Sequence, residues 1–302
     1  MEMRKYLWPL CILILLFSSC GSSPEEVKRQ TRAERARLKT EDSLALKVAV
    51  LPTLDCLPIY IGVEQGLFKE RGVDVHLRKW NAQMDCDTAM IGGSIEGTVT
   101  DLIRGERMKR KGVALRYVAA TNTYWQMIAN RTTRVNSVSQ LGDKMIAMTR
   151  YSATDYLTDY YMKGAKTSAA FFKIQINDVK LRLQMLQNNA MDAMWLPEPQ
   201  ATAARQLKNV VLKDSQKDDI RLGVIAFREK AMNDARIHKQ VDNFITVYNM
   251  ACDSINKNGL HYYSELISKY CGVDEETVSA LPKLHFPHAQ SPRGVDVERA
   301  RQ

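Results

Sequence analysis

Residues 47–66 read KVAVLPTLDCLPIYIGVEQG and contain a strand, a loop and a helix in succession. The apolar run 47–51 is typical of a strand buried on both faces of a parallel sheet. The segment 57–66 has proline at its second residue and glycine at its end, the usual placements at the first turn and the stop of a helix. The stretch therefore predicts one strand–helix unit of an α/β fold.

The same alternation continues along the chain in two successive sets. The further strands are expected at 73–77, 95–99, 115–120, 125–130, 144–149, 171–176, 191–196, 210–212 and 222–227. The helices between them are expected at 84–91 and 101–111, after Ser152 and after Asp178, and residues 229–281 are almost entirely helix candidates. Strands that alternate with helices predict parallel sheets with right-handed crossovers.

Two α/β sets followed by a helical tail predict two lobes, one of which is completed by the returning chain. We expect residues 46–122 and 224–302 to form lobe I and residues 123–223 to form lobe II. Two crossing strands, near 122–124 and 222–224, then make a hinge, and the gap between the lobes is the natural ligand cleft.

The first twenty residues predict export. Arg4 and Lys5 precede an apolar run at 7–17, and Ser18-Ser19-Cys20-Gly21 follows, which is the order of a signal peptide. Eleven apolar residues are too few to span a membrane, which takes about 20. The stretch resembles a bacterial lipoprotein signal, so we expect residues 1–19 to be removed and Cys20 to become a lipid anchor; cleavage without lipid is the alternative.

Residues 20–45 carry mixed charges and no apolar face, so we expect a tether between membrane and folded body and leave open whether part of it is helical. The whole chain has net charge +9, with both signs interspersed and no zinc-finger, basic-zipper or RNA-binding signature, so we expect no nucleic-acid partner.

Four cysteines remain after the signal and the anchor, at Cys56, Cys86, Cys252 and Cys271. No two of them have C-x-x-C spacing and no H-E-x-x-H occurs, so we expect no metal site, and a Cys252–Cys271 bridge stays open. Walker, G-x-S-x-G and G-x-G-x-x-G motifs do not occur in the sequence either, so we expect no cofactor.

Four segments carry a resemblance to a known family: residues 57–75, 92–101, 139–147 and 185–199. Taken in order and with their spacing, they resemble the periplasmic substrate-binding proteins of ABC importers, closest to the group that serves sulfonates, nitrate, taurine and thiamine-precursor pyrimidines. The resemblance covers about residues 46–205. It implies a two-lobed, type II-like, hinge-closing monomer that binds a small molecule and hands it to a membrane permease.

Ligands of such folds collect at loops beyond the carboxyl ends of the strands. The loops at this edge are expected at 53–56, 81–87, 122–125, 150–154 and 195–199. From them we take as candidate ligand contacts Asp55, Asp85, Asn122, Tyr124, Trp125, Tyr151, Ser152, Thr154, Trp195 and Glu198. The competing interpretations are helix capping for Asp55 and Ser152, a helix N-terminal charge for Asp85 and Glu198, a hinge role for Asn122, and core packing for each single aromatic residue.

The candidate loops hold several carboxylates, which disfavours an anion without further Arg or Lys. The ligand expected from sequence is an aminopyrimidine that stacks on Tyr124, Trp125 or Trp195 and donates its exocyclic amine to Glu198. Two alternatives to an import receptor stay open. One is an enzyme on the same fold, such as a thiamine-pyrimidine synthase, whose cysteine-rich iron motif is missing here, or a menaquinone-route dehydratase; the other is a ligand-sensing receptor.

Overall fold

The computed structural model describes residues 24–302, which fall into two units that meet between Leu44 and Ala45. In the first unit the expected tether is a helix, α2 (Pro24–Leu44), whose side chains from residue 32 onward are nearly all exposed. No helix among the described residues is long and apolar enough to cross a membrane. The predicted signal peptide and Cys20 lie outside the described residues.

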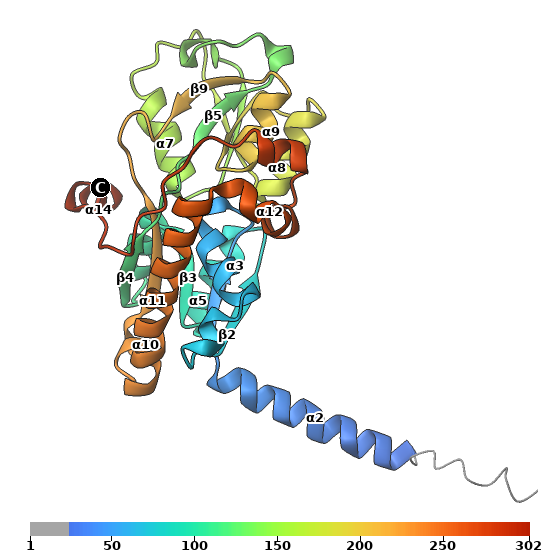
Figure 1. Cartoon of the computed structure of the whole chain (residues 1–302). Helices are drawn as coiled ribbons and strands as arrows, with labels where there is room; N and C mark the ends of the chain where they lie inside the picture. Colours follow the sequence, from blue (N-terminus) through green and yellow to red (C-terminus); the bar gives the residue numbers. More distant parts are fainter. Residues whose placement is uncertain (1–23) are drawn as a thin grey trace, which may run out of the picture. The chain divides into compact units, whose positions relative to one another are not determined.

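The second unit contains two five-stranded sheets with helices around them (Figure 1). The first sheet has the order β2-β1-β3-β10-β4. Its strands are β1 (Leu46–Val50), β2 (Val75–Lys79), β3 (Gly97–Asp101), β4 (Leu115–Ala120) and β10 (Gly223–Arg228). The second has the order β7-β6-β8-β5-β9. Its strands are β5 (Gln126–Ala129), β6 (Met145–Met148), β7 (Phe172–Gln175), β8 (Ala193–Leu196) and β9 (Val210–Asp214).

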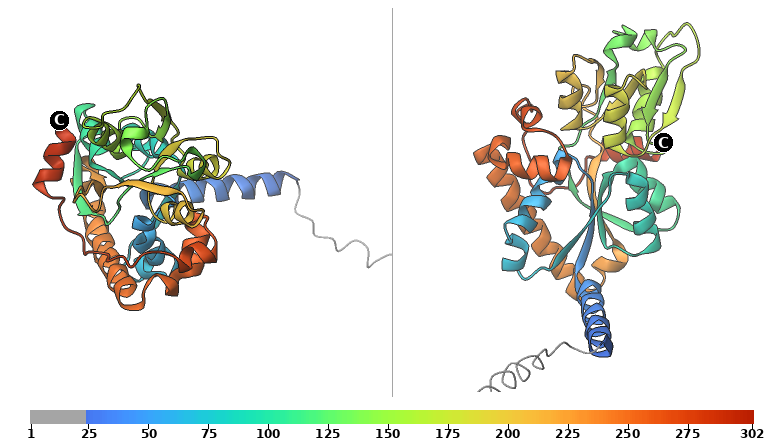
Figure 2. Two further views of the ribbon diagram at one scale, coloured as in Figure 1. Left: turned by 90° about the horizontal axis from the view of Figure 1, so that it is seen from above. Right: turned by 90° about the vertical axis from the view of Figure 1, so that its right-hand side faces the viewer.

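We call the first sheet with its helices lobe I and the second sheet with its helices lobe II. The right-hand view of Figure 2 shows the two lobes from the side. The chain passes between the sheets twice, through residues 121–125 and 215–222. This arrangement is the expected two-lobed α/β fold. The two crossings, which were expected to be strands, are loops that join β4 to β5 and β9 to β10. The lobe boundaries at 122/123 and 223/224 remain predictions.

The prediction of all-parallel sheets is wrong at one strand in each sheet. Strand β10 runs antiparallel to both β3 and β4, and β5 runs antiparallel to both β8 and β9. Strand β5 is the first strand after the crossing at 121–125, and β10 is the first strand after the crossing at 215–222. Each of the two strands therefore enters its sheet from the edge that faces the other lobe. The strands that follow a helix in a βαβ unit start from the opposite edge of the sheet, so β5 and β10 run antiparallel to them.

Helices cover both sheets. Lobe I has η1 (Leu54–Cys56), α3 (Leu57–Glu64), α4 (Leu67–Glu70), α5 (Gln83–Gly92), α6 (Leu102–Arg110), α10 (Glu229–Met232), α11 (Ala235–Asn258), η4 (Leu260–Tyr263), α12 (Ser264–Cys271), α13 (Glu275–Ser279) and α14 (Gly294–Arg301). Lobe II has η2 (Arg131–Thr133), η3 (Val138–Gln140), α7 (Ala153–Met162), α8 (Val179–Gln187) and α9 (Gln200–Gln206).

Alternating side chains place lobe II helices on opposite faces of its sheet. Met127 and Ala129 of β5 belong to the apolar cluster that includes α7, whereas Ile128 belongs to the cluster that includes α8 and α9. In lobe I, the long helix α11 buries Val241, Phe244 and further residues at helical spacing against the sheet. The four cysteines of the described residues, Cys56, Cys86, Cys252 and Cys271, are buried free thiols, so no Cys252–Cys271 disulfide is formed.

Candidate functional site

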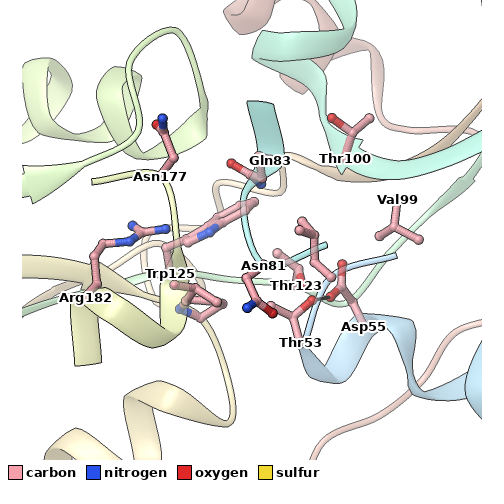
Figure 3. A pocket seen from close by; sticks show the side chains of 13 residues that line it. Thr53, Asp55, Asn81, Gln83, Val99, Thr100, Thr123, Trp125, Asn177 and Arg182 are labelled. Carbon is pink, nitrogen blue, oxygen red and sulfur yellow. Dashed lines mark hydrogen bonds between the residues drawn. The ribbon is translucent and has the colours of Figure 1, made fainter. Parts of the chain in front are cut away.

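A cavity, partly open to solvent, lies where the two lobes meet (Figure 3). Lobe I supplies side chains from the loops after β1 and β2 and from the end of β3. Lobe II supplies them from the β7–α8 loop, from α8 and from the residue after β8, and the crossing segment at 121–125 adds two more. The lining residues are Leu51, Thr53, Asp55, Asn81, Gln83, Val99, Thr100, Thr123, Trp125, Asn177, Val179, Arg182 and Pro197. The cavity is therefore at the strand-end edge that the fold predicts for ligands.

Asp55 is the acidic group of this cavity. It lies in η1, is only 5% exposed, and accepts hydrogen bonds from Thr53 Oγ1 at 2.6 Å and Thr121 Oγ1 at 3.3 Å. It does not cap α3, whose N-cap residue is Cys56. Burial raises the pKa of Asp55 above its usual value, against the effect of these hydroxyl donors.

Arg182 is the basic group of the cavity, and it comes from α8 in the other lobe. Asp178 caps α8 by accepting from the backbone N–H groups of Lys180 and Leu181, at 2.8 and 3.0 Å. Arg182 is 3% exposed and donates from Nη1 to the carbonyl oxygen of Trp195 at 2.7 Å. Burial lowers the pKa of Arg182 to about 10.

The lobes contact each other across the mouth of this cavity. The backbone N–H of Val179 donates to the carbonyl of Asn81 at 3.4 Å, and Ala82 and Asp178 form an isolated antiparallel bridge. The amide of Asn177 donates to Met84 Sδ at 2.9 Å. The structure therefore shows the lobes in a closed arrangement.

Two of the predicted ligand contacts, Asp55 and Trp125, line this cavity. Asn122 and Tyr124 line a separate cavity between the crossing segment and residues 283–296. The Asn122 amide donates to the carbonyl of His285 at 3.1 Å. Asp85 is exposed in the first turn of α5 and does not line the central cavity.

The loop at 150–154 serves helix α7 and the lobe contact. Ser152 is the N-cap of α7 and accepts from the backbone N–H of Thr154, while Thr154 Oγ1 accepts from the N–H of Thr149 at 2.9 Å. The capping interpretation of Ser152 is therefore confirmed. Tyr151 is 53% exposed and lies under the Arg107 guanidinium of α6, 4.0 Å from the ring centroid, in a cation–π contact between the lobes.

Trp195 and Glu198 both bond within the protein. The Trp195 indole is fully buried, donates to Thr158 Oγ1 at 2.8 Å and stacks on Tyr161. Glu198 precedes α9 and is 4% exposed. Its carboxylate accepts from Tyr124 Oη at 2.9 Å, from the N–H and Oγ1 of Thr202 at 3.0 and 2.7 Å, and pairs with Arg205 at 2.9 Å.

Sequence reasoning missed Arg182, although it selected the loops that supply Thr53, Asn81 and Gln83. A signal was present in the sequence. Val179, Leu183 and Leu186 mark the apolar face of α8, and Arg182 falls on that face instead of the solvated one. A charge on a buried helix face needs a partner, which is a reason to look for a site.

Comparison with known proteins identifies the family. A sequence model of the NMT1/THI5-like family matches residues 53–258, which is more than half of the chain. The chain belongs to the NMT1/THI5-like family. No curated protein sequence matched the chain.

Solved structures share the fold of this NMT1/THI5-like chain at low sequence identity. The alkanesulfonate-binding protein SsuA of Xanthomonas axonopodis pv. citri, bound to MOPS, has a TM-score of 0.70 at 15% identity, over 85% of this chain and 89% of that one. The aliphatic sulphonate binding protein SsuA of Escherichia coli has 0.68 at 16% identity, over 85% of each chain. The nitrate-binding protein NrtA of Synechocystis PCC 6803 has 0.66 at 15%, over 77% and 68%. The fold is thus that of the periplasmic binding proteins.

Proposed function

We propose that this protein is the solute-binding component of an ABC importer, which binds a small molecule in the central cavity and delivers it to a membrane permease. One observation carries the proposal: the cavity between the closed lobes, at the strand-end edge, takes a buried ionisable side chain from each lobe, Asp55 and Arg182. The similar structures are named for binding sulfonates or nitrate, which supports a transport role on this fold.

The N-terminal sequence supports a location outside the cytoplasm. The apolar run at 7–17 and the Ser18-Ser19-Cys20-Gly21 segment are expected to direct export and attach lipid to Cys20. The charged helix α2 then tethers a monomeric body to the periplasmic side of the membrane. A membrane-anchored position suits a protein that passes its ligand to a permease.

The structure favours a different acceptor for a ligand amine than the Glu198 contact predicted from sequence. Its carboxylate already accepts from Tyr124 and Thr202 and pairs with Arg205, so it has little capacity left for a ligand amine. Asp55 is the carboxylate that lines the cavity, and Trp125 is the aromatic side chain there. A ligand amine therefore has Asp55 as its acceptor.

Thermal shift of the purified mature chain against a broad metabolite panel tests the proposal. A ligand at 100 times its Kd stabilises the folded protein by about 2.7 kcal/mol, which raises Tm by roughly 5–10 °C for a body of this size. Any hit is then incubated with the protein and analysed by mass spectrometry. An unchanged ligand supports a binding protein; conversion to product favours the enzyme alternative, and a panel without any shift contradicts a solute receptor.

A further inference from the structure

Arg182 is a buried cation without a salt-bridge partner among residues 24–302. Its Nη1 bonds to a neutral carbonyl, and its Nε has no hydrogen-bond acceptor among residues 24–302. The Asp178 carboxylate favours the charged guanidinium, but it caps the first turn of α8 and forms no salt bridge with Arg182. Burying an isolated charge is costly, and the planar guanidinium fork matches an oxyanion of a carboxylate, sulfonate or phosphate.

Asp55, from lobe I, is a buried carboxylate without a cationic partner in the part of the chain that the structure describes. Its hydrogen-bond donors are the hydroxyls of Thr53, Thr121 and Thr123, and no cation of the described residues pairs with it. Figure 3 shows the Asp55 carboxylate beside Thr53 and Thr123 on one side of the cavity, and the Arg182 guanidinium reaching towards Trp125 from the other. The two groups thus have opposite sign when ionised and lie on opposite walls.

We infer that the ligand is a small zwitterion, with an oxyanion at Arg182 and a protonated amine or amidine at Asp55. The inference rests on the proposed binding function of the same cavity. Between the two charged ends, the amides of Asn81, Gln83 and Asn177 line the cavity and supply further donors and acceptors.

Ligands with one charge fit this cavity less well. A simple anion pairs with Arg182 but leaves Asp55 without a cation and adds repulsion in a poorly solvated space. A simple cation or a neutral amine satisfies Asp55 but leaves Arg182 unpaired. Only a ligand with both charges gives each buried group a counter-ion.

Calorimetry with three matched probe series tests the inference. The first series is ω-amino acids from β-alanine to 6-aminohexanoate together with the aminoalkyl sulfonates of the same lengths. The second is the corresponding alkyl carboxylates and sulfonates, and the third is the alkylamines. We expect at least one zwitterion to bind 10-fold or more tightly than both of its single-charge analogues.

Two variants then assign the charges. Asp55→Asn keeps the size of the side chain and should weaken the zwitterion about 10- to 100-fold without weakening the matched anion, which is no longer repelled by Asp55. Arg182→Met should weaken the zwitterion similarly without weakening the matched amine. Because Arg182→Met replaces an unpaired buried charge with an apolar chain, it should fold, which circular dichroism and Tm verify. Exposed Arg150→Met and Asp143→Asn are matched controls that should bind like the parent.

The outcomes separate this inference from the proposed function. An anion or amine that binds as tightly as the zwitterion of its length, or variants that fold and bind like the parent, overturns the inference. The same holds if no zwitterion binds while another metabolite raises Tm, and in that case the receptor proposal survives. If no probe and no metabolite moves Tm, both fail.

Discussion

The Glu198 carboxylate either stabilises the fold or contacts the ligand, and Glu198→Gln tests which of these roles it has. The structure gives this carboxylate one hydroxyl, one backbone N–H, one threonine hydroxyl and one guanidinium as partners, from Tyr124, Thr202 and Arg205. Glutamine has nearly the same shape but replaces one acceptor oxygen with a donor. Whichever oxygen is replaced, at least one donor of the protein then faces another donor.

The size of the effect follows from these partners. Leaving a buried donor such as the Thr202 N–H without its acceptor costs about 1–3 kcal/mol. The Arg205 side chain is 28% exposed, so its loss of a charged partner adds up to about 1 kcal/mol. We therefore expect Glu198→Gln to lower the free energy of unfolding by about 1–4 kcal/mol, and Tm by roughly 2–16 °C.

Thermal and urea unfolding measure this change, with Asp85→Asn as the control. Both substitutions remove one negative charge near a helix N-terminus, but Asp85 is exposed, so its variant should lose only about 0.3–1 kcal/mol. A Glu198→Gln protein as stable as Asp85→Asn refutes the structural role. If that stable variant also loses ligand affinity, Glu198 contacts the ligand, as the sequence first predicted.

Three further predictions address the anchor, pH and the C-terminal segment. Cys20→Ala should move the protein from the membrane to the soluble fraction or block its processing, since α2 has no apolar face; unchanged membrane association on fractionation contradicts the lipid anchor. Burial raises the pKa of Asp101 from 3.8 to about 6, so between these pH values the native state holds a proton that the unfolded chain releases, and the free energy of unfolding falls by up to about 3 kcal/mol from pH 4 to 6. Asp101→Asn should flatten the plot of unfolding free energy against pH over this range, as measured with urea. An Asp101→Asn protein with the same slope as the parent contradicts this role of Asp101. Asp296 is fully buried and pairs with Arg293 and Arg299 at 2.6 and 2.7 Å, but these arginines are 35% and 27% exposed, so Asp296→Ala should cost about 1–2 kcal/mol in chemical denaturation. A loss below about 0.5 kcal/mol shows that these pairs do not stabilise the C-terminal segment.

Local patterns in the sequence predicted most elements of the fold because those elements depend on near neighbours. The strand expected at 115–120 is β4, and the N-caps expected at Ser152 and Asp178 begin α7 and α8. Strand direction depends instead on where the chain re-enters a sheet. The antiparallel placement of β5 and β10 therefore needed the three-dimensional path of the chain.

The candidate site was predictable only in part for a related reason. Loops at strand ends are recognisable in sequence, which led to Asp55 and Trp125. Whether a side chain in such a loop is available depends on distant partners: Glu198 is bonded by Tyr124, 74 positions away in sequence. Arg182 lies in a helix, where a search restricted to loops does not look.

The placement of Asp55 and Arg182 on different lobes also connects binding to closure. A ligand shifts a conformational equilibrium only by its difference in affinity for the two states. A molecule held by one lobe alone binds the open and the closed arrangements nearly equally, and so it cannot drive closure. A ligand that needs both Asp55 and Arg182 gains its second contact only when the Asn81–Val179 contact forms and the lobes meet. In the proposed receptor, the same pair of residues therefore selects the ligand and stabilises the closed arrangement.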